Sequence, residues 1–191
     1  MAERQEQTAP DALLTRIGQV VMLHHGGDRE EARIRLLDLW TEMGAAGDPL
    51  HRCTLAHYLA DTQDDPTDEL AWDLRALSAA QELTDDHDGD APPGARAFFP
   101  SLHLNLAADY AKLGRAADAR SHLRRARLAA GALSDDGYGV GVRAAISRLE
   151  TSLGGESGPG GDGRPGGEGR PGGGGRPGGE GWGPPRQRPT P

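Results

Sequence analysis

Two side chains that could act together chemically, Cys53 and His57, are four residues apart, so they share one face if their segment is helical. A thiolate beside an imidazole could serve as a nucleophile pair or as half of a metal site. The sequence contains no Cys-x-x-Cys or His-Glu-x-x-His motif, and no third ligand stands at a useful spacing. We therefore interpret Cys53, the only cysteine, as a buried structural residue, and no intrachain disulfide framework is possible.

Two other segments contain side chains that could bind a cation or a proton. The acidic segment 84–96 includes Asp86-x-Asp88-Gly89-Asp90, which is similar to part of a calcium-binding loop. The glycine is at the wrong position and the closing bidentate glutamate is missing, so a solvated acidic loop is expected. His24-His25 ends a predicted helix, where a cationic side chain interacts favourably with the helix dipole. The sequence thus predicts no enzyme activity, no cofactor and no bound metal.

The composition divides the chain into a folded part and a low-complexity tail. Residues 154–191 hold 17 of the 29 glycines and 8 of the 14 prolines, and Trp182 is their only large apolar side chain. Such a segment cannot bury enough apolar surface to offset the entropy that is lost on ordering. We expect a disordered arm at residues 1–10, a helical domain at 11–153 and a disordered Gly/Pro/Arg-rich tail at 154–191. The repeated Arg-Pro-Gly-Gly of the tail indicates a flexible linker, with a weakly adhesive arm as the alternative.

Charge argues against a nucleic-acid partner, and the lack of long apolar runs argues against a membrane partner. The net charge is −8, and because the tail has five arginines and four acidic residues, the rest of the chain carries −9. An acidic body disfavours nucleic-acid binding, and the arginines within 120–127 are best interpreted as a solvated helix face. Met1–Gln7 has no apolar signal core, and no run approaches the roughly 20 apolar residues of a membrane span. These features predict a cytoplasmic protein that binds neither nucleic acid nor membrane.

Start and stop signals predict seven helices in residues 11–153 and no strand. The expected starts are Asp11, Asp28, Asp48-Pro49, Asp64-Asp65-Pro66, Phe98-Phe99-Pro100, Ala116 and Ser134-Asp135-Asp136. Asp28 with Glu31 has the spacing of a capping box, and glycines such as Gly44 and Gly114 end helices. Residues 66–83 carry two apolar stripes, typical of a helix that is packed on both sides: Leu70-Leu74-Leu77 and Trp72-Ala76-Ala79-Leu83. Three antiparallel pairs plus a final helix is the expected assembly, and a globin-like or bundle arrangement is the alternative.

One helical pair contains a recognisable repeat motif. Leu106-Ala107-x2-Tyr110 resembles the Leu-Gly-x2-Tyr of tetratricopeptide repeats, and Ala119-x3-Leu123 resembles their Ala-x3-Phe. The other two pairs match more loosely. The chain is also similar to small actinobacterial tetratricopeptide proteins across residues 48–53 and 68–74. The resemblance implies an all-α fold, with about three antiparallel hairpins stacked as a short solenoid and closed by a C-terminal capping helix.

In the tetratricopeptide family, the first helix of each pair lines a concave groove. The resemblance places nine residues there: Ile17, Val21, His24, Cys53, His57, Ser101, Leu104, Asn105 and Ala108. Such a wall is mostly small and apolar, and it would suit an apolar peptide or another helix. Alternatively, these side chains pack against the capping helix or the long loop. Our hypothesis is a non-catalytic adaptor or scaffold that binds an unidentified protein or peptide in this groove. The alternative is a regulatory or sensor module that acts on a transcription factor or a small-molecule ligand.

Overall fold

The structure, a computed structural model, describes residues 8–44, 46–85 and 95–155. These residues form seven α-helices and two short 3-10 helices, without a strand, so the predicted all-α class is confirmed. The elements are α2 (Thr8–His25), α3 (Arg29–Met43), α4 (Pro49–Asp61), α5 (Pro66–Asp85), η1 (Ala95–Ala97), α6 (Phe99–Lys112), α7 (Ala116–Ala129), η2 (Ala130–Ala132) and α8 (Gly137–Gly155). Most of the predicted arm (1–7), the calcium-like segment (86–94) and the tail from residue 156 lie outside the described residues.

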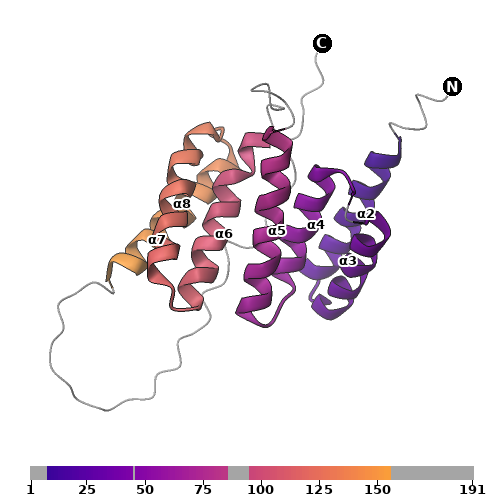
Figure 1. The fold of residues 1–191 in the computed structure, drawn as a ribbon, viewed down its shortest axis with the longest axis horizontal. Helices are drawn as coiled ribbons and strands as arrows, with labels where there is room; N and C mark the ends of the chain where they lie inside the picture. Colours follow the sequence, from indigo (N-terminus) through magenta and orange to yellow (C-terminus); the bar gives the residue numbers. More distant parts are fainter. Residues whose placement is uncertain (1–7, 45, 86–94, 156–191) are drawn as a thin grey trace, which may run out of the picture.

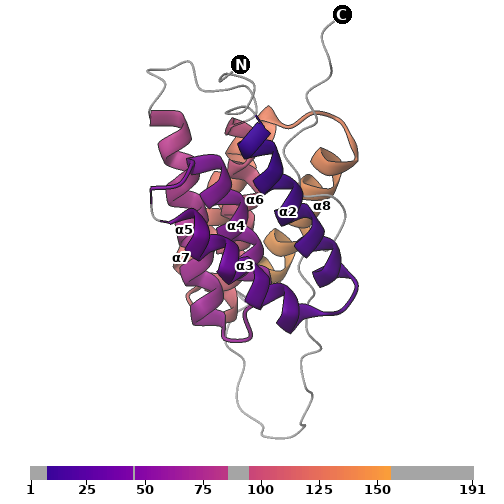
Figure 2. The same ribbon diagram turned by 90° about the vertical axis from the view of Figure 1, so that its right-hand side faces the viewer.

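The helices stand side by side in chain order along the long axis of the molecule (Figure 1). They pack as three consecutive pairs, α2 with α3, α4 with α5 and α6 with α7. In the perpendicular view, α4 and α6 lie one behind the other, as do α5 and α7, so the second and third pairs repeat the same arrangement (Figure 2). The last helix, α8, packs against both α6 and α7. The architecture is therefore a stack of helical pairs that a single helix closes at the C-terminal end.

The acidic residues predicted to begin three of the helices form the expected caps. Asp48 Oδ1 accepts hydrogen bonds from the backbone N–H groups of Leu50 and His51 at 2.9 and 3.3 Å. Asp65 accepts from the N–H of Thr67 at 2.7 Å, and Asp136 accepts from the N–H of Gly139 at 2.8 Å. Each bond satisfies an N–H group that has no partner within its helix.

Two predicted helix ends are also confirmed at glycines. Gly44 and Gly114 follow α3 and α6 with φ of 72° each. An L residue with a side chain rarely adopts this conformation, and it turns the chain out of the helix. These glycines therefore set where the next segment begins.

The second predicted helix start, Asp28, is confirmed in position but lacks its capping box, and the first, Asp11, is wrong. The side chain of Asp28 makes no capping hydrogen bond, and Glu31 instead pairs with Arg35 one turn later at 2.7 Å. The capping box is therefore absent, and α3 begins with an uncapped first turn. The helix α2 begins at Thr8, so Asp11 lies inside it. Pro10 is compatible with this earlier start because it falls in the first turn, where a missing N–H is tolerated.

The two apolar stripes predicted for α5 are confirmed with one exception. Helix α5 packs against α4 on one side and α6 on the other, and Leu70 and Leu77 are buried. Leu74, however, is 41% exposed. The buried side of α5 is centred on Asp73, one residue earlier, so Leu74 is rotated away from it toward solvent.

Two apolar clusters form the core, and a pair of tryptophans joins them. The smaller cluster holds α2, α3 and part of α4 together, and the larger one extends from α4 to α8. Trp40 and Trp72 pack against both clusters. Their rings meet edge to face, with centroids 5.1 Å apart and an interplanar angle of 86°. This geometry is favourable for aromatic pairs, so it helps to fix the first pair of helices on the second.

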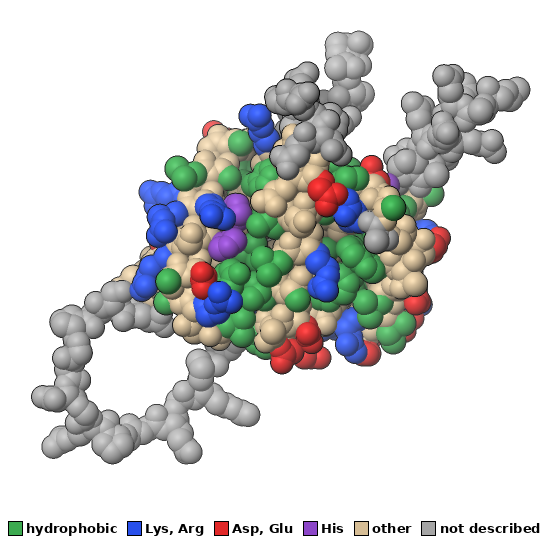
Figure 3. Space-filling model, in the orientation of Figure 1, with side chains coloured by type: hydrophobic (Ala, Val, Ile, Leu, Met, Phe, Trp, Pro, Cys, Tyr) green, Lys and Arg blue, Asp and Glu red, His purple; other side chains and the backbone are tan. Residues whose placement is uncertain are grey.

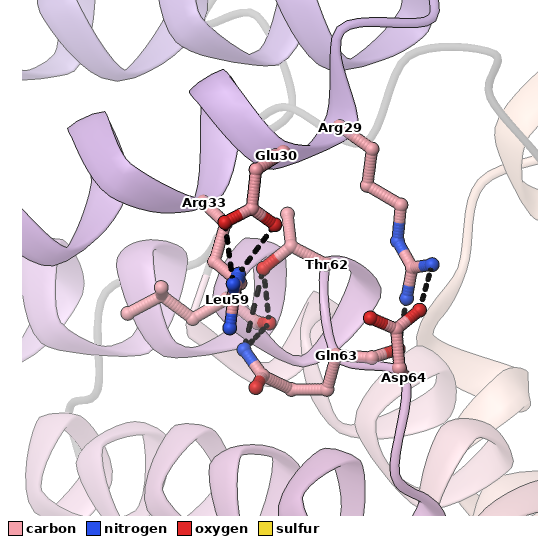
Figure 4. Close-up of polar contacts among 7 residues, drawn as sticks. All are labelled: Arg29, Glu30, Arg33, Leu59, Thr62, Gln63 and Asp64. Carbon is pink, nitrogen blue, oxygen red and sulfur yellow. Dashed lines mark hydrogen bonds and ion pairs between the residues drawn. The ribbon is translucent and has the colours of Figure 1, made fainter.

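A polar contact at the α4–α5 turn also joins the first helical pair to the second (Figure 4). The guanidinium of Arg29, at the start of α3, donates to the backbone carbonyl of Gln63 and pairs with Asp64, both in the turn between α4 and α5. The side chains of Thr62 and Gln63 donate hydrogen bonds to the carbonyl of Leu59 at 2.7 and 2.8 Å. These bonds give a partner to a carbonyl group in the last turn of α4. The α4–α5 turn is thus bonded both to α3, through Arg29, and to the end of α4, through Thr62 and Gln63.

The paired aspartates at the starts of α3 and α4 allow a direct test of capping. Asp48→Ala should lower the free energy of unfolding by about 1 kcal/mol, because two backbone N–H groups lose their acceptor. Asp28→Ala is the matched control, since it removes the same charge beside a helix start without removing a hydrogen bond. It should cost about 0.3 kcal/mol. Urea unfolding followed by circular dichroism measures both changes, and equal losses would show that only the charge matters.

Candidate functional site

The nine residues predicted to line a groove come from α2, α4 and α6, the first helices of the three pairs. Seven of them are buried: Ile17, Val21, Cys53, His57, Ser101, Leu104 and Asn105. Only His24 and Ala108 are partly exposed. In α4 and α6, which we call the inner helices, every residue is buried over Cys53–Ala60 and Pro100–Ala107. The accessible part of the predicted surface is therefore confined to its edges.

Some of these residues contact one another and others do not. The amide nitrogen of Asn105 lies 3.1 Å from Nδ1 of His57, so these predicted polar groups from α4 and α6 do meet. Ser101 instead accepts a hydrogen bond from the hydroxyl of Tyr138 on α8 at 3.0 Å. This contact fits the alternative in which predicted groove residues pack against the last helix. Ile17 and Val21 belong to the N-terminal core cluster and are separate from both contacts.

A pair of buried carboxyl groups lies beside His57 and Asn105. Asp73 of α5 and Asp109 of α6 are both fully buried. Oδ1 of Asp73 is 3.7 Å from Nδ1 of His57, and Oδ1 of Asp109 is 3.7 Å from Nζ of Lys112. Burial raises the pKa of Asp73 to about 7. Burial, and then the charge of Asp73, raise the pKa of Asp109 further, so the pair retains at least one proton at neutral pH.

Lys112, the only lysine of the chain, connects this pair to a third acid. Its ammonium group donates to both carboxylate oxygens of Glu69 at 2.8 and 2.7 Å, which joins α6 to α5. We call the five buried side chains His57, Glu69, Asp73, Asn105 and Asp109, together with the exposed Lys112 at their edge, the buried polar layer. It lies between the second and third helical pairs and can hold their register, because any slip would bury a charge without its partner.

The sequence analysis missed this layer, although a signal for it exists. Glu69, Asp73 and Ala80 lie at helical spacing between the two apolar stripes of α5. Acidic residues on a line between two buried faces are themselves expected to be buried. Among the described residues, no group of three or more His, Cys, Asp or Glu side chains is suited to hold a metal ion.

A second group of titratable side chains lies on α6 and α7. Nδ1 of His103 is 3.1 Å from Nδ1 of His122, so one ring donates to the other. Burial, with smaller effects of His122 and Arg125, lowers the pKa of His103 to about 4. Burial and the charge of Arg125 also lower the pKa of His122. Both rings are therefore neutral near pH 7. One ring can then donate its N–H to the unprotonated nitrogen of the other, whereas two cationic rings would repel each other.

The arginines of residues 120–127 are not equivalent. Arg127 pairs with Glu150 of α8 at 2.8 Å, and Arg120 donates to the carbonyl of Leu153 at 3.2 Å. These two arginines hold α8 against α7. Arg124 and Arg125 are exposed. The predicted solvated face is thus partly a contact surface for the closing helix.

The structure decides between the interpretations of two further residues. Cys53 is completely buried, and burial, together with the charge of Asp73, raises the pKa of its thiol to about 12. A thiol in this state is a poor nucleophile, so the interpretation as a buried structural cysteine is confirmed. His24 lies in the last turn of α2, as predicted, but its surroundings disfavour the cationic form. Partial burial, His25 and Arg29 all lower its pKa, and its neutral form is favoured.

Comparisons with known proteins were made at three levels, and no protein-family model, curated protein or solved structure matches the chain. Among the described residues, no helix combines the length and the apolar character needed to cross a lipid bilayer. Functional inference therefore rests on the fold and on the side chains described above.

Burial of Cys53 makes its reactivity a sensitive test of the core. In the folded protein, Ellman's reagent should label Cys53 at least about 100-fold more slowly than in denaturant, because the thiol must first become exposed by local opening. Absorbance at 412 nm, followed with and without urea, measures the ratio. Rapid labelling of the native protein would show that α4 is not enclosed.

The raised pKa values of Asp73 and Asp109 make stability depend on pH. The folded state retains protons that the unfolded chain releases above about pH 4, so the free energy of unfolding should fall as the pH rises from there toward the folded pKa values. Asp109→Asn, which mimics the protonated acid, should reduce this fall between about pH 5 and 9 by on the order of 1–3 kcal/mol.

Urea unfolding at both pH values measures this effect. Asp38→Asn on the exposed face of α3 is the control, and it should leave the pH dependence unchanged. The same slope in wild type and Asp109→Asn would show that the buried pair does not titrate as argued.

Proposed function

We propose that this protein is a non-catalytic interaction module of tetratricopeptide type, an adaptor that binds a peptide or a helix of a partner protein on the side formed by α2, α4 and α6. The observation that best supports the proposal is the repetition of the fold, in which α4 with α5 and α6 with α7 occupy equivalent positions (Figure 2). Stacked repeats produce extended surfaces rather than enclosed catalytic pockets.

The packing of the third pair also supports a tetratricopeptide arrangement. The resemblance requires small residues where the two helices of a pair approach closely. Ala107 on α6 and Ala119 and Ala126 on α7 are completely buried, and Tyr110 is buried beside them. A larger side chain at any of the three alanines would separate the helices.

The accessible residues at the edges of the surface are where a partner would make contact. Ala108 follows directly after the buried segment of α6, and His24 lies in the last turn of α2. Beneath Ala108, Asn105 is held by its contact with His57. This support fixes the backbone of α6, so a partner would meet a preorganised surface rather than a mobile one.

The alternative function, a regulatory or sensor module for a small-molecule ligand, has one observation in its favour. A pocket lined by aromatic, aliphatic and basic side chains opens beside Phe99 on α6. It is lined by none of the nine predicted groove residues.

The interaction proposal is tested by placing one charge on the partly exposed edge. Ala108→Glu should weaken binding of the partner by about 5- to 100-fold, because the new carboxylate must lose water against an apolar peptide or helix. Affinity capture with the whole chain, followed by mass spectrometry, identifies proteins that wild type retains and Ala108→Glu loses. Calorimetry with the purified candidate then measures the change in Kd.

Ala117→Glu is the matched control, because it adds the same charge at an exposed position in the first turn of α7. It should leave the Kd within about twofold of wild type. Equal loss from both variants would mean that overall charge controls binding. Retention of the same partners by Ala108→Glu would place the interaction elsewhere on the molecule.

A further inference from the structure

A pocket of about 390 Å³ opens at one end of the third helical pair, where α6 begins and α7 ends. Phe99, Leu128 and Ala129 form its apolar wall, and Arg96, His103 and Arg125 supply its polar groups. The space-filling view shows histidine beside basic side chains and a hydrophobic stretch over α6 and α7 (Figure 3). The volume lies in the lower part of the range of about 300–1,000 Å³ that is typical of small-molecule sites.

The two arginines of the pocket differ from the eight arginines that form ion pairs among the fourteen of the described residues. Arg16, Arg52 and Arg127 form ion pairs with glutamates of a neighbouring helix. Arg96 and Arg125, in contrast, have no carboxylate partner among the described residues. Two guanidinium groups beside one pocket repel each other, and an anion placed between them would remove that repulsion.

The histidine pair next to the pocket is also affected by Arg125, although burial has the larger effect on both rings. Arg125 disfavours the cationic forms of both His103 and His122. Asp118 opposes this effect at His122, but it does not line the pocket, and neither does any other acidic side chain of the described residues. The ring of His103 lies next to Phe99, with the two ring centroids 6.3 Å apart.

The apolar wall indicates that the anion carries an apolar body. Leu128 is 83% exposed, the largest exposure among the large hydrophobic side chains of the described residues. Phe99 and Ala129 flank it in the same pocket. Inorganic phosphate could compensate the arginines, but it would leave Leu128 in water. A neutral aromatic molecule could cover Leu128, but it would leave the arginines unpaired.

We propose that this pocket binds a small organic carboxylate with an aryl or short alkyl body. The carboxylate lies between Arg96 and Arg125, and the apolar body lies against Phe99 and Leu128. None of the nine predicted groove residues lines this pocket, so the proposal does not depend on the adaptor function.

Nuclear magnetic resonance of the full chain tests this proposal with three probes of defined chemistry. Sodium 4-phenylbutyrate should give saturable amide shifts that concentrate in residues 96–103 and 125–132. Its neutral amide, 4-phenylbutanamide, and inorganic phosphate should each bind at least about fivefold more weakly, because each lacks one of the two interactions. Equal affinity for the amide or for phosphate, or no saturation by the carboxylate, would overturn the proposal.

Two adjacent arginines provide the matched variants. Arg125→Gln should weaken 4-phenylbutyrate binding by at least about fivefold. Arg124→Gln removes the same charge from the same helix, at an exposed residue that does not line the pocket, and should change the affinity by less than about twofold. An equal loss of affinity for 4-phenylbutyrate in the two variants would show that the anion is attracted to the positive charge of α7 in general and not bound in the pocket. Unchanged circular dichroism in both variants confirms that neither change acts through unfolding.

Discussion

Close approach between helices is the constraint on which this structure depends. Eight alanines are completely buried, and every helix from α3 to α7 contributes at least one: Ala32, Ala56, Ala60, Ala76, Ala80, Ala107, Ala119 and Ala126. Alanine at a contact allows helix axes to come near one another, and longer side chains beside it then fill the remaining space. A chain with only 4% aromatic residues can build its core in this way, because narrow contacts leave little volume to fill.

This constraint also explains which parts of the fold could be predicted from the sequence. Helix ends depend on local chemistry, so Asp48-Pro49 and Gly114 identified them correctly. The pairing of α6 with α7 was predictable because Ala107 and Ala119 stand on either side of a short glycine turn. Asp28 failed as a cap although its sequence pattern is correct, because capping requires a backbone geometry that its ψ of 59° does not provide.

The two apolar stripes of α5 could have indicated that Glu69 and Asp73 are buried, but not which groups these acids meet, because the buried polar layer is a relation between helices. Asp73 and Asp109 are 36 positions apart, and no local pattern links one to the other. Only the packing of α5 on α6 brings their carboxyl groups into one buried polar cluster. The predicted groove residues are similar. Register with a family pattern placed His57 and Asn105 near each other, but it could not show that both would be buried.

The distribution of burial separates residues that maintain the stack from residues that can contact other molecules. Over Cys53–Ala60 and Pro100–Ala107 every side chain of the inner helices is buried, so substitutions there act first on folding. In α4 and α6 the partly accessible residues lie outside these two buried segments, as Ala108 and Phe99 do. Arg125 and Leu128 lie in the last turns of α7, and Phe99 begins α6. Substitutions at the end of a helical pair can therefore change which molecules that end contacts, with little effect on the contacts that hold the stack together.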